Sequence, residues 1–491
     1  MDSTLILFCL LAYFLILFGI SQFTSRNASN ATYFTANRNS SWWLVAFGMI
    51  GASLSGVTFI SVPGWVSDRQ FSYMQMVLGY IPGYLLIAFV LMPLYYRLKL
   101  TTIYTYLGQR FGEVSYKTGS AFFLLSRLMG SALRMYLVAN VLQEILFDDL
   151  GIPFPLTVGL SILLVWLYTF RAGIKTIVWT DTLQTAFMLL ALIFTIVLIG
   201  KELNWGFWES LQQVKHSSYS QIFFFDDPGD ARYFFKQFLS GALIALVMTG
   251  LDQDMMQKNL TCKNIGEAQK NMVSFSIVLI FANLLFLSLG ALLYMYAGQK
   301  GIPLPEKADN LFGMIATDGG LGAVVGVFFV LGLVAAAYSS ADSALTALTT
   351  SFCIDILGIE RKELSEQESL RKKVHIGFSV LTVIIIIVSR EFHDDSLFNT
   401  IFQVASYTYG PLLGLFAFGM LSKRAVQDSW TPFISVLAPL ISFYIASHSE
   451  EWWDYKFGYE ILLVNGLLTA LGLWLSGLTL KGSKAEVRSE N

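Results

Sequence analysis

Residues 43–64 read WLVAFGMIGASLSGVTFISVPG, a stretch that is long and apolar enough to cross a bilayer. Residues that weaken or interrupt a helix crowd into it: Gly48, Gly51, Ser53, Ser55, Gly56, Pro63 and Gly64. Unwound backbone at membrane depth is tolerated only where it lines a cavity or is buried in protein, and such breaks present carbonyls to ions. We therefore predict a broken span, with close helix packing as the alternative interpretation, because glycine and proline are also common in intact membrane helices.

The chain around this stretch is just as apolar. Its composition is 55% hydrophobic and 13% charged, with a mean hydropathy of +0.59, and the charged fraction is about half that of a soluble domain. Apolar runs of about 20 residues recur along the whole length and leave no stretch for a separate soluble core. The sequence predicts an all-α integral membrane protein, a single domain over residues 1–491 that is surrounded by the lipid bilayer of the cell membrane.

Thirteen apolar runs predict about 13 transmembrane helices. They lie near residues 4–22, 43–67, 73–98, 118–147, 152–170, 173–200, 233–251, 270–297, 318–356, 374–390, 396–421, 430–447 and 457–479. An odd number of spans places the termini on opposite faces. If the first loop is inside, about two thirds of the 32 Lys and Arg residues, Lys258 among them, fall in inside segments. This distribution predicts an N-terminus outside and a C-terminus in the cytoplasm.

Motifs of enzymes and of nucleic-acid-binding proteins are not found. The net charge is −2 with no long basic stretch, and Cys9, Cys262 and Cys353 follow no metal or disulfide spacing. The sequence contains no nucleophile elbow and no Walker motif. We therefore predict no enzymatic activity, no nucleic-acid partner and no obligatory protein partner. Because a phosphate-binding loop is lacking, any uphill transport must draw on an ion gradient.

A second polar stretch inside an apolar run is AAYSSADS at residues 336–343. At helical spacing Ala336, Ser339, Ser340 and Ser343 share a face, and Asp342 adds a carboxylate. A charge at membrane depth costs about 2.5–3.5 kcal/mol and is kept where it faces a cavity, a partner or an ion. Hydroxyls and carbonyls with one carboxylate suit a hard monovalent cation rather than zinc or copper. The alternative is that these serines bond to carbonyls one turn earlier and help helices pack.

A further carboxylate, Asp181, lies in GIKTIVWTDTLQ at residues 173–184, roughly two helical turns into the sixth predicted span. At that depth it needs a partner. The candidates are a cation that is shared with the serines of residues 336–343, or a buried arginine such as Arg127 or Arg134.

Four motifs carry a resemblance to a known family. They are GIKTIVWTDTLQ at 173–184, GLDQDMMQ at 250–257, Ser339–Ser340, and YGPLLGLF at 409–416. With them the chain resembles the sodium/solute symporter family, which includes transporters of sugars, proline, sialic acid, iodide and vitamins. The resemblance implies a LeuT-like core of two inverted five-helix repeats, approximately residues 43–200 and 233–421. The helices at 4–22, 430–447 and 457–479 would then be peripheral.

The resemblance also implies one or two sodium ions. In the principal site the carbonyls of Gly51, Leu54 and Ala336 and the hydroxyls of Ser339 and Ser340 would bind sodium.

Some members bind a second sodium, which here would use Asp181, Ser340 and Ser343. Asp342 departs from the family pattern, which has a hydroxyl at this position in members with the second site. Its carboxylate would strengthen cation binding, admit a proton, or pair with an arginine.

The expected solute pocket lies against the broken second span. Sugar-transporting members have a Glu-Gln pair and an aromatic gate where this chain has Val57–Thr58 and Met248–Thr249, so a galactose-like sugar is disfavoured. Ser55 and Thr58 match hydroxyl residues in the pocket of sialic-acid-transporting members.

Arg127 and Arg134 lie seven residues apart on one helix face, where a guanidinium can clamp a carboxylate. Sialic-acid-transporting members also place an arginine on this helix, which favours Arg134 as a solute ligand. The alternative is that one or both arginines form structural ion pairs with Asp181 or Asp342. Gln75 and Gln403 are candidates for the pocket wall or for contacts between helices.

These observations predict sodium-coupled secondary symport of a small organic solute by alternating access, and they favour an anionic solute such as a sialic acid. Two alternatives are symport of a sugar or other neutral solute, and a sensor or channel built on the same scaffold.

Overall fold

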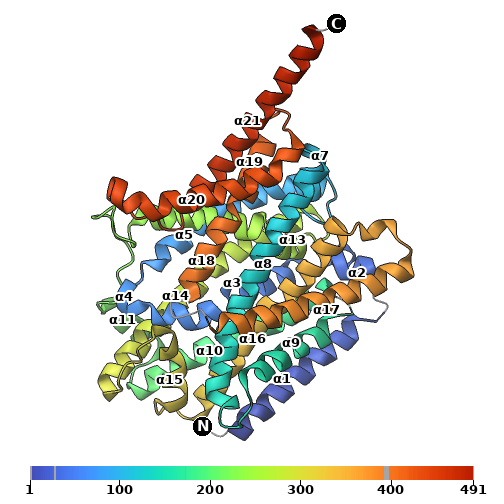
Figure 1. Ribbon diagram of the computed structural model, residues 1–491. Coiled ribbons are helices and arrows are strands. Elements are labelled where there is room, and N and C mark those ends of the chain that lie inside the picture. The colour runs from blue at the N-terminus through green and yellow to red at the C-terminus, as the bar shows by residue number, and fades with distance from the viewer. Residues whose placement is uncertain (1–2, 27–28, 172, 392–396, 490–491) are drawn as a thin grey trace.

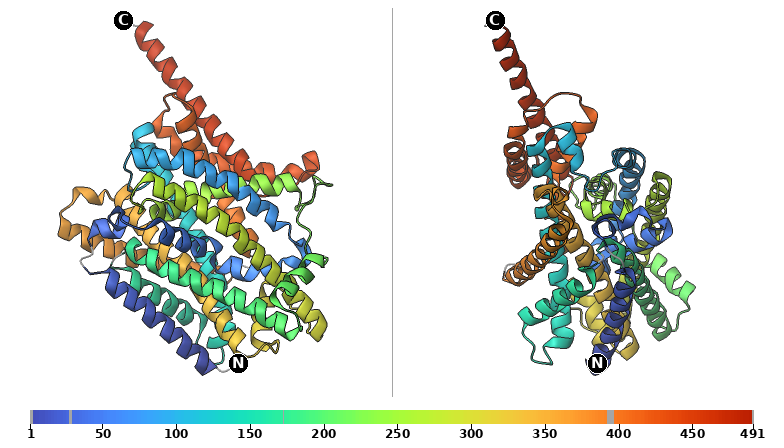
Figure 2. Two further views of the ribbon diagram at one scale, coloured as in Figure 1. Left: turned by 180° about the vertical axis from the view of Figure 1, so that it is seen from behind. Right: turned by 90° about the vertical axis from the view of Figure 1, so that its right-hand side faces the viewer.

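The computed structural model describes residues 3–26, 29–171, 173–391 and 397–489 (Figure 1). These residues form helices and their connections, and no named strand occurs among them. Figure 2 shows the helices gathered into one bundle, with the first helix and the last helix reaching opposite ends of it. The prediction of an all-α membrane protein is confirmed.

Ten helices, some with a π-helical continuation, are long and apolar enough to cross a membrane. They are α1 (Ser3–Thr24), α3 (Trp42–Gly64), α5 (Tyr73–Leu86) with η2 (Ile87–Leu91) and α6 (Met92–Arg97), α8 (Glu113–Leu142) with η3 (Gln143–Phe147), α10 (Ile174–Glu202), α14 (Ile265–Lys300), α16 (Ala323–Ser351) with η6 (Phe352–Ile356), α17 (Leu364–Ser389), α20 (Thr431–Trp453) and α21 (Ile461–Ser489).

Two further spans are bent pairs of helices. They are α12 (Phe234–Ala245) with η4 (Leu246–Gly250) and α13 (Gln253–Asn259), and α18 (Leu397–Thr408) with α19 (Gly410–Leu421). The remaining elements are α2 (Asn30–Thr35), η1 (Ala36–Arg38), α4 (Val66–Arg69), α7 (Thr105–Arg110), α9 (Phe154–Thr169), α11 (Phe207–His216), η5 (Ala308–Asn310), α15 (Leu311–Asp318), η7 (Ile359–Arg361) and η8 (Asp428–Trp430).

The predicted number of 13 spans is not confirmed. Ten helices and two bent pairs give up to 12 spans among the described residues. The other predicted span coincides with α9, which is apolar but has 16 residues and is short for a hydrocarbon core of about 30 Å at 1.5 Å per residue. Residue 396, where the eleventh predicted span begins, lies outside the described residues.

The break that was predicted in the second span is present in α3. Ser55 has φ 37° and ψ 167°, so the backbone leaves the helix at this residue and resumes it afterwards. A positive φ is uncommon for a residue with a side chain and marks a conformation that the surrounding structure holds in place. The residues on both sides of Ser55 are buried, so the unwound backbone faces the interior.

A second break separates η4 from α13, where the chain bends by 68°. After the bend, Asp252 is the N-cap of α13. Its carboxylate accepts a hydrogen bond of 2.8 Å from the amide of Asp254. At the far end of α13 the amide of Ser40, just before α3, donates to the carbonyl of Thr261 over 3.0 Å. The start of the first broken span is thus tied to the end of the second.

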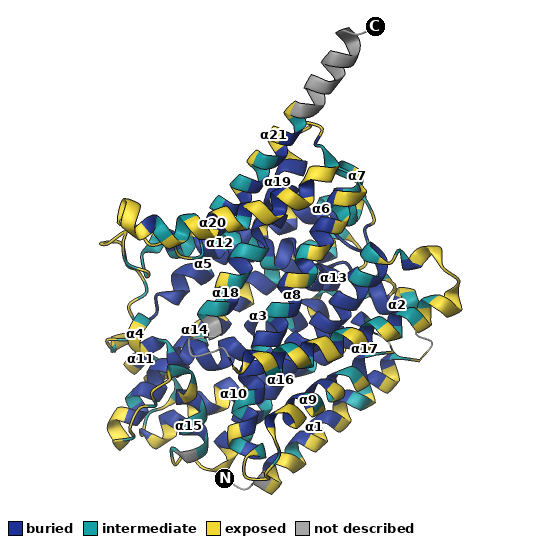
Figure 3. Ribbon diagram, in the orientation of Figure 1, coloured by how far each residue is buried: buried dark blue, intermediate teal, exposed yellow. Residues whose placement is uncertain are grey.

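The core of the bundle lies where α3, α10 and α16 meet, and glycine allows this close approach. A Cβ on Gly51 would lie 2.3 Å from Oγ1 of Thr185 on α10. The Gly51 amide instead donates to that oxygen over 3.0 Å. Figure 3 shows this centre as buried, with exposed residues gathered on the outer helices. Large apolar side chains on α1 and α20, such as Phe8 and Phe433, are exposed, as the lipid-facing surface of a membrane protein requires.

Candidate functional site

A cavity lies at the break of α3. Its walls come from α3, α5, α8, α12 with η4, α13, α14 and α18. Its polar lining residues are Ser53, Ser55, Thr58, Tyr73, Tyr80, Tyr84, Arg127, Arg134, Thr249 and Asn283. Apolar walls with a few convergent polar groups are the usual composition of a small-molecule site.

The two arginines of α8 have different surroundings in this cavity. Arg127 is buried and forms an ion pair with Asp254 of α13, and its Nη1 lies 3.9 Å from Oδ2 of Asp252. Arg134 is half-buried, and among the described residues no carboxylate forms an ion pair with it. Arg134 therefore presents a cation to the cavity that the described part of the protein does not neutralise.

The network around Arg127 ties α8, α13, α16 and the start of α19 together on one side of the cavity. Tyr409, just before α19, donates its hydroxyl to Asp252, and Ser343 of α16 donates to Oδ2 of Asp254 over 3.2 Å. A buried ion pair is stable only with such additional hydrogen bonds, because both charges lose their hydration. The residues of this network hold one another in place, and through them Arg127 is fixed at the cavity that it lines.

The predicted solute residues divide into two groups. Ser55, Thr58 and Arg134 line the cavity. Gln75 does not, because its amide donates to the carbonyl of Arg232 over 2.7 Å and accepts from the amide of Phe224, and so holds the loop between α11 and α12. Gln403 is exposed and is not part of the cavity lining, although its neighbour Phe402 is.

Several cavity residues escaped prediction. Tyr73, Tyr80 and Tyr84 of α5 recur at helical spacing and share a face, a pattern that could have singled them out. The hydroxyls of Tyr73 and Tyr80 lie 3.1 Å apart. The sequence around Asn283 of α14 contains no pattern that would have predicted its place in the cavity. Its amide nitrogen donates to its own helix, and among the described residues its Oδ1 has no hydrogen-bond partner.

The predicted cation ligands gather beside the cavity, where α3, α10 and α16 meet. Ser340 donates its hydroxyl to the carbonyl of Ala52 in α3 over 3.4 Å, and Ala336 is buried one turn away. Gly51 and Leu54, whose carbonyls were predicted ligands, flank Ala52 in the same buried stretch. Carbonyl and hydroxyl oxygens of this kind are ligands for a hard cation such as sodium.

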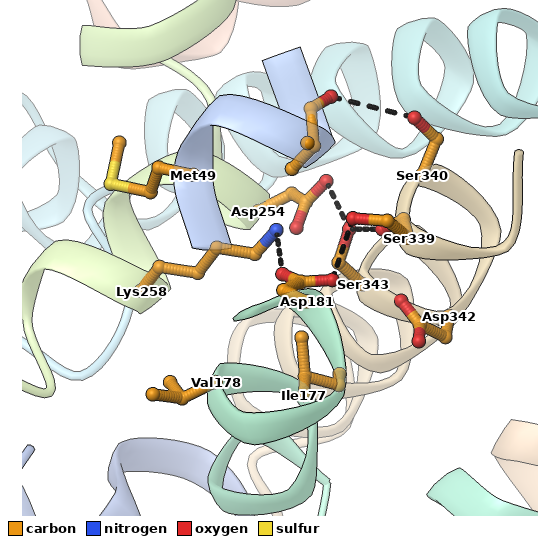
Figure 4. A network of polar contacts seen from close by, with 12 residues as sticks. Met49, Ile177, Val178, Asp181, Asp254, Lys258, Ser339, Ser340, Asp342 and Ser343 are labelled. Atoms are coloured by element: carbon orange, nitrogen blue, oxygen red, sulfur yellow. Dashed lines mark hydrogen bonds and ion pairs between the residues drawn. The ribbon is translucent and has the colours of Figure 1, made fainter. Parts of the chain in front are cut away.

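Ser339 is directed away from the α3 break. Its hydroxyl donates to Oδ1 of Asp181 on α10 over 2.6 Å, as Figure 4 shows. The serine pair at 339 and 340 thus connects α16 to both α10 and α3. The fully buried Asp181 packs against α3 as well, because a Cβ on Gly48 would lie 3.0 Å from its Cβ.

The partner of Asp181 is Lys258. Its Nζ lies 2.8 Å from Oδ2 of Asp181, and the side chain is almost completely buried. The prediction that placed Lys258 in an inside segment is therefore wrong. Of the two alternatives for the partner of Asp181, the one that named Arg127 or Arg134 is wrong as well. The reason is the bend before α13, which turns this helix inward and buries all seven of its residues.

Asp342 lies beside this group on α16. Its Oδ2 accepts a hydrogen bond of 2.8 Å from the hydroxyl of Tyr168 on α9, and Oδ1 has no hydrogen-bond partner among the described residues. No Lys or Arg in the described part of the chain forms an ion pair with it. The predicted alternative of an arginine partner for Asp342 is wrong. Arg127 forms its ion pair with Asp254 of α13 instead.

A membrane-spanning helical bundle in which two interrupted helices meet at a polar cavity has the architecture of a secondary transporter. The profile of the sodium:solute symporter family matches residues 33–429, so the chain belongs to this family. The family resemblance that was inferred from the four motifs is confirmed.

Curated relatives cover most of the chain. The sodium/sialic acid symporter NanT of Aliivibrio fischeri is 26% identical over 456 residues, which are 87% of this chain and 85% of that protein. The sodium/sialic acid symporter SiaT of Proteus mirabilis is 24% identical over 89% of this chain and 88% of its own length. The human sodium-coupled monocarboxylate transporter 2 is 24% identical over 84% of this chain and 67% of its own length.

Solved structures share the fold. A Na⁺-coupled sialic acid symporter in a substrate-bound outward-open state superposes with a TM-score of 0.81 and 18% identity over 98% of both chains. The nucleobase-cation-symport-1 transporter Mhp1, in a closed conformation with bromovinylhydantoin, has a TM-score of 0.59 and 14% identity over 91% of this chain and 93% of its own. The predicted LeuT-like fold is confirmed.

Proposed function

We propose that this protein is a sodium-coupled symporter of a small anionic solute, and that a sialic acid is the solute. The observation that carries the proposal is Arg134, a cation on the wall of the cavity without a carboxylate partner among the described residues. A guanidinium binds a carboxylate through two parallel hydrogen bonds, each strengthened by charge. Arg127 does not compete for the solute, because Asp254 and Asp252 already surround it.

The rest of the cavity suits a carboxylate that is attached to a hydroxylated body. Ser55, Thr58 and the Oδ1 of Asn283, which has no partner in the described part of the chain, offer donors and acceptors. The tyrosines of α5 offer apolar faces with polar tips. Several relatives transport acids or anions by name: sialic acid, monocarboxylates and iodide. These names support an anionic solute for this chain.

Sodium binds where the interrupted α3 meets α16. The carbonyls of Gly51, Leu54 and Ala336 and the hydroxyl of Ser340 are the proposed ligands, and the contact between Ser340 and the Ala52 carbonyl supports this position. The hydroxyl of Ser339, which donates to Asp181 in this structure, joins them only after it turns toward α3. Sodium in this place holds the unwound end of α3, which also lines the solute cavity. A coupling ion acts by binding one conformation more tightly than the other, so an ordered α3 links the ion to the solute.

A second cation position lies at Asp181, with Ser340, Ser343 and Asp342 as the further groups around it. The ammonium of Lys258, 2.8 Å from Oδ2 of Asp181, already brings a positive charge to this buried group of carboxylates.

The core consists of two inverted repeats, residues 43–200 and 233–421, and each repeat begins with an interrupted span. The helices at 4–22, 430–447 and 457–479 are peripheral to it. The N-terminus faces outside and the C-terminus the cytoplasm. A reporter that is active on one side of the membrane only, fused to the C-terminus, tests this orientation.

The solute is tested by thermal unfolding of the purified protein with N-acetylneuraminate, glucose, proline or pyruvate, each in sodium and in potassium buffer. We expect stabilisation by N-acetylneuraminate in sodium buffer only. Arg134→Met removes charge-assisted hydrogen bonds worth about 1.5–3 kcal/mol and weakens binding of this solute about 10-fold to 100-fold.

The matched control is Arg97→Met at the exposed end of α6, which should leave solute binding unchanged. Stabilisation by glucose or proline instead of the acid would overturn the anionic solute. An Arg134→Met protein with unchanged affinity would remove the observation on which the proposal rests.

A further inference from the structure

Lys258 is an unexpected member of the buried group around Asp181. It lies on α13, and all seven residues of that helix are buried. The Nζ of Lys258 reaches to 2.8 Å from Oδ2 of Asp181, and Figure 4 shows it entering the group from the side opposite Asp342. Lysine is strongly hydrated and almost never fully buried unless it is paired. Its position here therefore depends on Asp181.

The groups expected to bind a second sodium are already in contact with other residues of the chain. The second carboxylate oxygen of Asp181 accepts from Ser339 over 2.6 Å, so both oxygens of this carboxylate have partners. Ser343 donates its hydroxyl to Asp254, one turn before Lys258 on the same helix. The described residues thus supply Asp181 with one monovalent cation and one hydroxyl donor.

An ammonium and a sodium ion carry the same charge, and either one neutralises a single carboxylate. Two cations within a few ångströms repel each other strongly in a buried site, where water does not screen them. Asp181 can therefore hold the ammonium of Lys258 or a sodium ion, but not both.

We infer that the ammonium of Lys258 is a resident cation that takes the place of a second sodium ion at Asp181, so that one sodium ion binds per chain, at the break of α3. This inference rests on the proposed function, since it presupposes that sodium binds at that break. Lys258 is covalently part of α13. The cation at Asp181 is thus not exchanged with the solution but moves only with the inner half of the second broken span.

The inference is tested by equilibrium binding of ²²Na⁺ to the purified protein, with the number of ions per chain as the readout. We expect one ion for the natural protein and two for Lys258→Met, because this substitution leaves Asp181 without its cation. Lys258→Arg keeps the charge and should bind one ion. The matched control is Lys236→Met, which replaces another buried lysine, whose Nζ contacts the Lys456 carbonyl at 3.1 Å, far along the chain from this group.

A second readout covers variants that fold poorly. Lys258→Met should depend on sodium for its thermal stability more steeply than the natural protein, with potassium chloride as the comparison. If Lys258→Met does not fold in either salt, the double variant Lys258→Met/Asp181→Asn tests the inference in its place, because it removes both charges of the ion pair. It should bind one ion with the affinity of the natural protein.

The results separate the inference from the proposed function. No sodium bound to the natural protein would overturn both. Two ions bound to the natural protein would overturn only the inference. A folded Lys258→Met protein that still binds one ion, or a double variant that loses its sodium, would also overturn the inference while sodium binding itself stands.

Discussion

The break in α3 and the break before α13 differ in the chemistry that surrounds them. Residues 43–64 contain no ionisable side chain, so the unwound backbone at Ser55 has no charged residue on its own helix. Within seven residues, α13 and its cap carry Asp252, Asp254 and Lys258, all buried. These three side chains pair with Tyr409, Arg127 and Asp181, which lie on three different parts of the bundle.

The difference shows two ways to hold an interrupted helix inside a membrane. The first break is held by close packing against α10 and α16, which leaves its carbonyls near the hydroxyl of Ser340. The second break is held by buried charges that reach across to neighbouring helices. Removal of a charge should therefore disrupt the second break, and added volume should disrupt the first.

The largest effect is expected from Arg127→Met. The substitution leaves Asp254 as a buried carboxylate without a cation, which typically costs about 3–5 kcal/mol. We expect a much lower yield of monodisperse protein and a lower thermal midpoint, both measured by size-exclusion chromatography after heating.

The double variant Arg127→Met/Asp254→Leu is the control, since it removes both charges and should recover most of the lost stability. A single variant as stable as the natural protein would show that packing holds the second break as it holds the first.

A smaller effect is expected at the first break from Gly51→Ala. The added methyl group would lie 2.3 Å from Oγ1 of Thr185, so α3 and α10 must move apart, at a cost of about 1–3 kcal/mol. The measurement is the thermal midpoint in potassium buffer, where sodium does not contribute.

Gly298→Ala provides the comparison, because a Cβ at Gly298 meets nothing within 4 Å. Adding Thr185→Ala to Gly51→Ala should restore part of the stability. Equal midpoints for the two glycine variants would disprove close packing as the support of the first break.

The smallest effect is expected from Ser340→Ala. Loss of one hydroxyl near the carbonyl of Ala52 removes about 1 kcal/mol, and the sodium concentration for half-maximal thermal stabilisation should rise several-fold. Ser288→Ala is the matched control, because the Ser288 hydroxyl bonds to the Leu284 carbonyl within its own helix. An unchanged sodium dependence would separate Ser340 from the proposed sodium site.

Local patterns in the sequence were enough to find the break in α3, because glycine, proline and serine act on the backbone of their own segment. The hydroxyl-rich face of α16 followed in the same way from helical spacing. The roles of Gln75, Gln403 and Lys258 did not follow, since each depends on which other segment lies opposite. A bend of 68° turned Lys258 from an expected surface residue into a buried one.

Apolar run length, helix-interrupting residues and family motifs thus predicted a helical membrane transporter and several of the segments that line its cavity. The number of spans, the partners of the buried charges and the contrast between Arg127 and Arg134 came from the packed structure. The physical reason is the separation along the chain of the residues that interact. Hydrophobicity and backbone preference are properties of neighbouring residues, whereas charge pairing at 2.8 Å, as between Lys258 and Asp181, joins residues that only the packing of separate helices brings together.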